Sequence, residues 1–149
     1  MRLSCPLNDA LCDFTDTPEF ETHMGLQLEA LLFQNRPLFL QKLGISPVDR
    51  VRSDPYRKTK TTNQQGCQID SLVQPKTNSL FVCEFKFKKR EINSDIISEM
   101  QNKISKLKTP KGFAKGAVLF YLSGVASSVA TNPSFYRIVD IIYFLDIAL

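Results

Sequence analysis

Apolar positions in the first third of the chain recur at helical intervals. Over residues 18–35 they follow three- and four-residue steps, which predicts an amphipathic helix. Thr17 precedes Pro18 and is a suitable N-cap, because a threonine hydroxyl accepts from the free N–H groups of a first helical turn. A shorter helical piece over residues 38–44 is expected after an interruption at Pro37.

Strand-like patterns dominate the middle of the chain. A short strand is expected near Val51, followed by a polar and basic loop. The apolar runs 67–74 and 79–87 flank the polar break Pro75-Lys76-Thr77-Asn78, and together they predict a β-hairpin.

The last third of the chain returns to a helical period and then becomes strongly apolar. A helix is expected to start after Asn93 or Ser94 and to end before Pro110. Residues 116–124 form a nearly continuous apolar run, which is typical of a buried strand. The final apolar segment, 135–149, fits either a strand or a short helix.

This order of elements and the composition predict one mixed α/β domain around a small sheet. The 149 residues, 43% hydrophobic and 23% charged, suffice for a buried core without disulfides. We expect a single domain over 1–149, with 1–16 as an N-terminal extension and 17–149 as the core. There is neither a membrane-length apolar run nor a signal-peptide pattern, so the cytoplasm is the expected location, without a membrane partner.

Positive charge is concentrated in the segment that holds the hairpin. Residues 50–115 carry 15 basic and 6 acidic residues, whereas residues 1–49 carry 3 and 7. A basic face suits a polyanion such as nucleic acid, although a solvated lysine-rich surface has the same composition. The candidate nucleic-acid-binding residues are Arg57, Lys58, Lys60, Lys88 and Lys103.

Charged residues interrupt the apolar second strand of the hairpin. Glu84 and Lys86 share one face of that strand, because side chains alternate between faces. Pairing that is symmetrical about Thr77 would place Asp70 opposite Glu84, with Cβ atoms about 5 Å apart. A slip of one residue would put the two acids on opposite faces. Facing carboxylates repel each other unless a cation lies between them, and a divalent metal such as magnesium suits oxygen ligands.

Two further polar residues on the helices are candidates for the same site. Glu29 lies at the edge of the first apolar stripe, and Gln101 is expected on the inward side that Ile97 and Ile104 define. Each candidate also has an ordinary explanation. Glu84 and Lys86 fit an exposed strand face, and Glu29 and Gln101 fit the borders of amphipathic helices.

Together these residues resemble a known superfamily. Ile69-Asp70, then Val82-Cys83-Glu84-Phe85-Lys86, then Glu99-Met100-Gln101 resemble the motif of the PD-(D/E)XK nucleases. Over roughly residues 20–145 the chain looks like the C-terminal nuclease-like domain of a group of bacterial and archaeal AAA-type ATPases. The resemblance implies a restriction-endonuclease-like αβββαβ core, with a mixed central sheet flanked by helices.

The resemblance also implies roles for the site residues. Asp70 and Glu84 would be ligands of Mg²⁺ or Mn²⁺, and Lys86 would position the hydrolytic water. Glu29 and Gln101 match polar residues that family members bring from the first core helix and from the helix after the motif. No Gly-x4-Gly-Lys-[Ser/Thr] sequence occurs, so ATP hydrolysis is not expected, and a stand-alone domain and the remnant of a longer gene are both open.

The sequence therefore favours a metal-dependent nuclease that hydrolyses phosphodiester bonds of nucleic acid, with DNA preferred over RNA as the expected substrate. The alternative is a catalytically silent nucleic-acid-binding or regulatory module related to the C-terminal domain of AAA-type ATPases. A homodimer and a separate ATPase chain are both open as protein partners.

Overall fold

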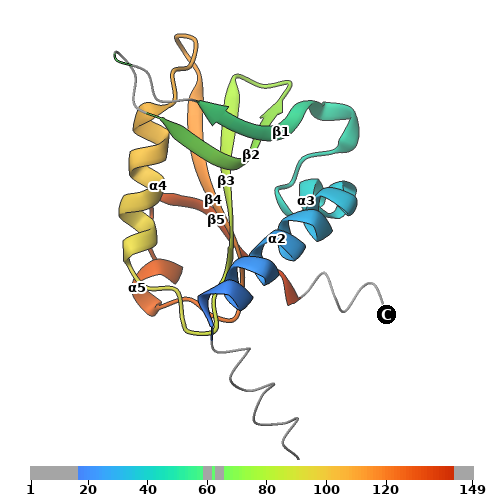
Figure 1. Cartoon of the computed structure of the whole chain (residues 1–149). Coiled ribbons are helices and arrows are strands. Elements are labelled where there is room, and N and C mark those ends of the chain that lie inside the picture. The colour runs from blue at the N-terminus through green and yellow to red at the C-terminus, as the bar shows by residue number, and fades with distance from the viewer. Residues whose placement is uncertain (1–16, 59–61, 63–65, 143–149) are drawn as a thin grey trace, which may run out of the picture.

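A mixed five-stranded sheet lies at the centre of the fold, with helices against both of its faces (Figure 1). The computed structural model of the protein describes residues 17–58, 62 and 66–142. In chain order the elements are α2 (Pro18–Gln34), α3 (Arg36–Lys42), the 3₁₀ helix η1 (Pro47–Asp49), β1 (Arg50–Lys58), β2 (Cys67–Pro75), β3 (Ser79–Phe87), α4 (Asp95–Lys106), β4 (Ala114–Leu122), α5 (Ser127–Ala130) and β5 (Phe135–Asp140). The predicted mixed α/β class and αβββαβ order are confirmed.

The strands follow one another across the sheet in the order β1-β2-β3-β4-β5. The first three are antiparallel neighbours, whereas β4 runs parallel to β3 and β5 runs parallel to β4. Helix α4 makes the crossover from β3 to β4, as a parallel connection requires. Of the final apolar segment, residues 135–140 form a strand, and residues 143–149 lie outside the described residues.

One apolar layer fills the space between the sheet and the helices α2 and α3. Leu28 and Leu32 of α2 and Phe39 of α3 are buried there against Phe85 and Phe120 of the sheet. The Phe39 and Phe85 rings meet edge to face with centroids 5.8 Å apart, a favourable arrangement for aromatic pairs. This layer holds α2 and α3 on one face of the sheet (Figure 1).

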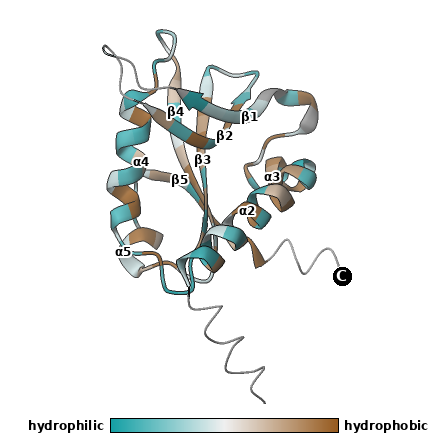
Figure 2. Cartoon of the chain, in the orientation of Figure 1, coloured by the Kyte–Doolittle hydropathy of each residue, from teal (hydrophilic) through white to brown (hydrophobic). Residues whose placement is uncertain are grey.

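A second apolar layer lies under α4 on the opposite face. Ile96 and Met100 are buried against Val82 and Leu119. Figure 2 shows hydrophobic residues along the central strands, whereas α4 alternates between hydrophobic and hydrophilic positions. The middle of strand β3 is thus covered from both faces, and a charged side chain there, such as Glu84, has little access to water.

The termini of α2 follow the prediction, whereas α3 does not. The Phe20 N–H donates to Thr17 Oγ1 at 3.2 Å, so Thr17 is the N-cap. Helix α3 begins at Arg36, so Pro37 does not interrupt the helix. Pro37 lies in the first turn of α3, where its missing N–H removes no helical hydrogen bond.

Strand β1 is longer than the short strand predicted near Val51. It runs for nine residues along the edge of the sheet and includes Pro55. The register shifts between Asp54 and Tyr56, so the proline lies at an irregularity of an edge strand, where a missing N–H is tolerated.

Helix α4 begins and ends as predicted. Ser94 is its N-cap residue, and the helix ends at Lys106, before Pro110. The Lys115 ammonium donates to the Leu107 carbonyl at 2.6 Å, which satisfies one free acceptor at the end of the helix. None of the described helices is long and apolar enough to cross a membrane.

Candidate active site

The hairpin of β2 and β3 opens into a fork on the side away from its turn. The recorded ladder pairs are Ser71–Cys83, Leu72–Val82 and Val73–Phe81. These pairs confirm the predicted register, which is symmetrical about Thr77. Beyond Ser71, the described part of β2 continues to pair with β1, as in Tyr56–Ile69, but has no further ladder pair with β3. The predicted direct opposition of Asp70 and Glu84 is therefore not seen as a ladder pair.

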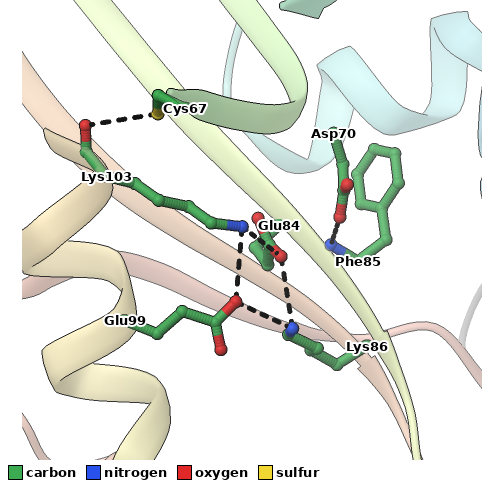
Figure 3. Close-up of polar contacts among 7 residues, drawn as sticks. All are labelled: Cys67, Asp70, Glu84, Phe85, Lys86, Glu99 and Lys103. Atoms are coloured by element: carbon green, nitrogen blue, oxygen red, sulfur yellow. Dashed lines mark hydrogen bonds and ion pairs between the residues drawn. The ribbon is translucent and has the colours of Figure 1, made fainter. Parts of the chain in front are cut away.

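Asp70 lies where the ladder between β2 and β3 ends. Its side chain takes the place of a backbone carbonyl as the acceptor for an N–H of β3. The Phe85 N–H donates to Asp70 Oδ2 at 2.9 Å (Figure 3). A backbone N–H of a central strand ordinarily donates to the carbonyl of a neighbouring strand. The contact fixes the Asp70 carboxylate beside the residue that separates Glu84 from Lys86.

Four charged side chains of alternating sign meet on the α4 side of β3 (Figure 3). We call Glu84, Lys86, Glu99 and Lys103 the ion quartet. Lys103 Nζ lies 2.6 Å from Glu84 Oε1, and Lys86 Nζ lies 2.9 Å from Glu99 Oε1. The two cross contacts, Lys86 to Glu84 and Lys103 to Glu99, are each 3.3 Å. The quartet therefore connects the central strand to the helix that covers it.

Glu84 is the most buried member of the quartet. The residue is only 3% exposed, and its Oε2 has no hydrogen-bond partner among the described residues. Burial is the largest influence on this carboxyl, and the Asp70 charge acts in the same direction. Together they raise the pKa of Glu84 to about 7, against the opposing effect of Lys103 and Lys86. Glu84 is thus a carboxyl group that changes charge near neutral pH.

Lys86 and Glu99 are each stabilised in the charged form by their contacts in the quartet. Burial by itself would lower the pKa of Lys86, but the contacts with Glu84 and Glu99 raise it above its ordinary value. Burial likewise opposes ionisation of Glu99, yet Lys86 and Lys103 together lower its pKa. Lys86 and Glu99 therefore stabilise each other in their charged forms next to Glu84.

Glu29 on α2 lies within range of the Asp70 charge. Burial, and then the charge of Asp70, raise the pKa of Glu29. Asp70 thus acts electrostatically on Glu29 as well as on Glu84, and a common site for the three carboxylates stays a prediction. No group of three or more His, Cys, Asp or Glu in the described part of the chain is arranged to hold a metal ion.

The predicted inward orientation of Gln101 is wrong. Its side chain is exposed and donates weakly to Ser134 Oγ at 3.4 Å. Helix α4 is anchored by Met100, and a step of one residue turns the side chain by about 100°. Gln101 therefore lies on one flank of the apolar stripe, and Glu99 lies on the opposite flank, which faces the site.

Glu99 was not among the predicted site residues, and Lys103 was predicted on the nucleic-acid-binding face. In the structure Lys103 is largely covered and its ammonium contacts two carboxylates. A signal was present, because opposite charges four residues apart on a helix lie on one side and can pair. The pattern could not say that this side faces β3.

The remaining predicted nucleic-acid-binding residues are spread along the chain. Arg57 is exposed, and its Nη2 donates to Gln68 Oε1 at 3.2 Å. Lys88 is exposed just after β3, and Lys58 is the last residue of β1. Lys60 lies outside the described residues.

A polar cleft gives solvent access to one side of the quartet. It has a volume of about 700 Å³ and includes Lys86 and Glu99 in its lining. Lys88, Arg90 and Asn93 form part of its wall, between the end of β3 and the start of α4. Lys86 and Glu99 can therefore be reached from solvent through this cleft.

Comparisons with known proteins add a similarity of shape. No family model matches the chain, and no curated protein matches it. The fold is similar to the crystal structure of a repair endonuclease from Pyrococcus abyssi, with a TM-score of 0.48 and 16% sequence identity. The match covers 84% of this chain and 47% of that chain, so this chain spans about half the length of that structure. The closer resemblance to ATPase C-terminal domains, the homodimer and the separate ATPase chain stay predictions.

Proposed function

We propose that this chain is a metal-dependent nuclease that hydrolyses phosphodiester bonds of nucleic acid, with DNA as the first substrate class to test. The observation that carries the proposal is the fork itself. Asp70, Glu84 and Lys86 gather where β2 leaves β3, and the backbone contact at Phe85 holds Asp70 there. Two acids beside a lysine that lines a polar cleft suit metal-assisted hydrolysis of a phosphate ester.

The donor set of the fork fits a hard divalent cation. Asp70 and Glu84 offer carboxylate oxygens only, and the mutual repulsion of these acids is part of what raises the pKa of Glu84. The Oε2 of Glu84 is buried and has no hydrogen-bond partner among the described residues, which leaves Oε1 as the oxygen that faces the neighbouring charges. Oxygen ligands of this kind suit Mg²⁺ or Mn²⁺. When bound, such a cation polarises a phosphoryl oxygen and stabilises negative charge that develops on it.

The residues of the chain would divide the remaining work. Asp70 and Glu84 would hold the cation, and Glu29 would add negative charge from α2. Lys86 would position the attacking water, with its ammonium held by Glu99 at 2.9 Å. Arg57 and Lys88 would contact the nucleic-acid backbone, where cations replace bound counterions.

The test is cleavage of single-stranded, duplex and branched DNA and of RNA, with Mg²⁺, with Mn²⁺ and with a chelator. Asp70→Asn and Glu84→Gln are better variants than alanine substitutions, because an amide keeps the shape and one hydrogen-bond acceptor. Asp49→Asn is the matched control, since Asp49 is an exposed acid at the hairpin end of the sheet. We expect metal-dependent cutting that both site variants abolish and the control retains. Lys86→Met should slow cutting by about 100-fold or more.

The quartet also favours a second candidate function, the catalytically silent nucleic-acid-binding or regulatory module. Glu84 already has two lysine partners, and the described residues lack a third acidic ligand placed for a metal. A silent module would bind DNA in a salt-dependent way without metal and would cut no substrate. Cutting that survives both site variants would also refute the nuclease proposal at this site.

A further inference from the structure

Both lysines of the quartet approach the same oxygen of Glu84. Lys103 Nζ is 2.6 Å and Lys86 Nζ is 3.3 Å from Oε1, whereas Oε2 is buried. Two ammonium groups at one carboxylate oxygen leave little room for a third cation there. A divalent metal that binds Glu84 through Oε1 must therefore displace one of the lysines.

The contacts indicate which lysine moves. Lys86 lies closer to Glu99, at 2.9 Å, than to Glu84, at 3.3 Å. Lys103 has the reverse preference, at 2.6 Å from Glu84 and 3.3 Å from Glu99. Lys103 is thus the principal partner of Glu84, and Lys86 is the principal partner of Glu99.

A displaced Lys103 has an acceptor within reach. Glu99 lies one helical turn before it on α4, and their charged groups are already 3.3 Å apart. The Lys103 ammonium can therefore leave Glu84 and remain paired. Without a metal and with Glu84 ionised, the two positive and two negative charges of the quartet balance, which offsets the cost of burying Glu84.

We propose that Lys103 is a built-in counter-cation of Glu84, which a divalent metal must displace in order to bind at the fork. This inference rests on the proposed metal site and adds a positioning residue that controls access to it. The Lys103 ammonium holds Glu84 in place while the metal is absent, and it competes with the metal for the same oxygen. Removal of the Lys103 charge therefore strengthens metal binding.

The experiment is a calorimetric titration with Mn²⁺ and no nucleic acid, on the wild type and on Lys103→Met. Lys108→Met is the matched control, because Lys108 is exposed and its loss changes the net charge equally. We expect the Kd for Mn²⁺ to fall by about tenfold or more in Lys103→Met, the size of one charge-assisted hydrogen bond. The control should bind within about twofold of the wild type, and Lys86→Met should gain less than Lys103→Met. Equal affinities in Lys103→Met and Lys108→Met would overturn the inference.

A second measurement uses only the wild type and so does not depend on the folding of a variant. Amine-reactive labelling followed by mass spectrometry reports how accessible each lysine is. Mn²⁺ should raise the labelling of Lys103 and leave that of Lys108 unchanged, whereas unchanged labelling of Lys103 at saturating Mn²⁺ would overturn the inference.

The two proposals fail in different ways. Tight Mn²⁺ binding that Asp70→Asn abolishes, but that Lys103→Met does not improve, removes the counter-cation role and leaves the metal site. An absence of Mn²⁺ binding in the wild type and in Lys103→Met overturns both.

Discussion

The raised pKa of Glu84 predicts that this carboxyl group makes the folded state less stable as the pH rises. Burial, followed by the charge of Asp70, raises the pKa of Glu84 from 4.5 to about 7. The folded protein therefore keeps a proton on Glu84 at pH values where the unfolded chain has already released it. The substitution that isolates this effect is Glu84→Gln, which keeps the shape of the side chain and cannot ionise.

The size of the stability change follows from the difference between the pKa of Glu84 in the unfolded chain and its pKa in the folded protein. Below pH 4.5 the carboxyl is neutral in both states, and the contribution of Glu84 to stability is fully present. Between pH 4.5 and about 7 the folded state binds more protons, so the free energy of unfolding falls by about 1.4 kcal/mol for each pH unit. Summed over this window, the loss is about 3 kcal/mol, and it is complete above pH 7.

The assay is urea unfolding of the wild type and Glu84→Gln at pH 5 and pH 8, with a chelator present. Relative to Glu84→Gln, the wild type should lose roughly 2–3 kcal/mol between these pH values. Glu99, whose pKa is lowered, acts in the opposite direction, but it is present in both proteins and largely cancels. Asp49→Asn, in an exposed position, should follow the wild type at both pH values.

One result would refute this reasoning about Glu84. If Lys103 and Lys86 outweighed burial, the pKa of Glu84 would lie below its ordinary value. The wild type would then lose stability relative to Glu84→Gln as the pH falls toward 4, and would lose none between pH 5 and pH 8.

Three further substitutions test the surroundings of the site and the packing of the sheet by urea unfolding. Asp70→Ala leaves the Phe85 N–H without its acceptor and should cost about 1–3 kcal/mol, whereas Asp70→Asn should cost less, and equal costs would argue against the side-chain contact. Gly116→Val should destabilise by about 1–3 kcal/mol, because a Cβ on Gly116 would lie 3.1 Å from the Phe81 ring; an unchanged midpoint would contradict this packing. Gly25→Ala meets no atom within 4 Å on α2 and should stabilise by roughly 0.5–1 kcal/mol, and a loss of stability would contradict the open surroundings.

Much of the fold can be predicted from local patterns in the sequence. The helix after Thr17, the hairpin and the buried strand β4 each have a local pattern of apolar residues that predicts them. The hairpin register follows from the position of the turn. The full length of β1 could not be predicted from a local pattern, because it depends on pairing with β2 rather than on an apolar run within β1.

The candidate site was predictable only in part, and the reason is geometric. Alternation along β3 predicts that Glu84 and Lys86 share a face, and the register brings Asp70 near them. A helical pattern identifies the apolar stripe of α4 but treats its two flanks alike, so Gln101 was preferred to Glu99. The fork could not be predicted from the sequence either, because it arises where β2 continues to pair with β1 but no longer pairs with β3.

The hydrogen bond from the Phe85 N–H to Asp70 limits the number of protein oxygens that a metal ion at the fork would find. One oxygen of Asp70 is taken by the Phe85 N–H, and one oxygen of Glu84 is buried, so the chain offers a cation few free donor atoms. A cation with about six ligand positions would then draw most of them from water and from phosphate oxygens of the substrate. Under the proposed function, binding of metal and nucleic acid becomes cooperative, and by thermodynamic reciprocity each strengthens the other by the same factor. Affinities measured with either ligand alone would then lie below those of the assembled complex.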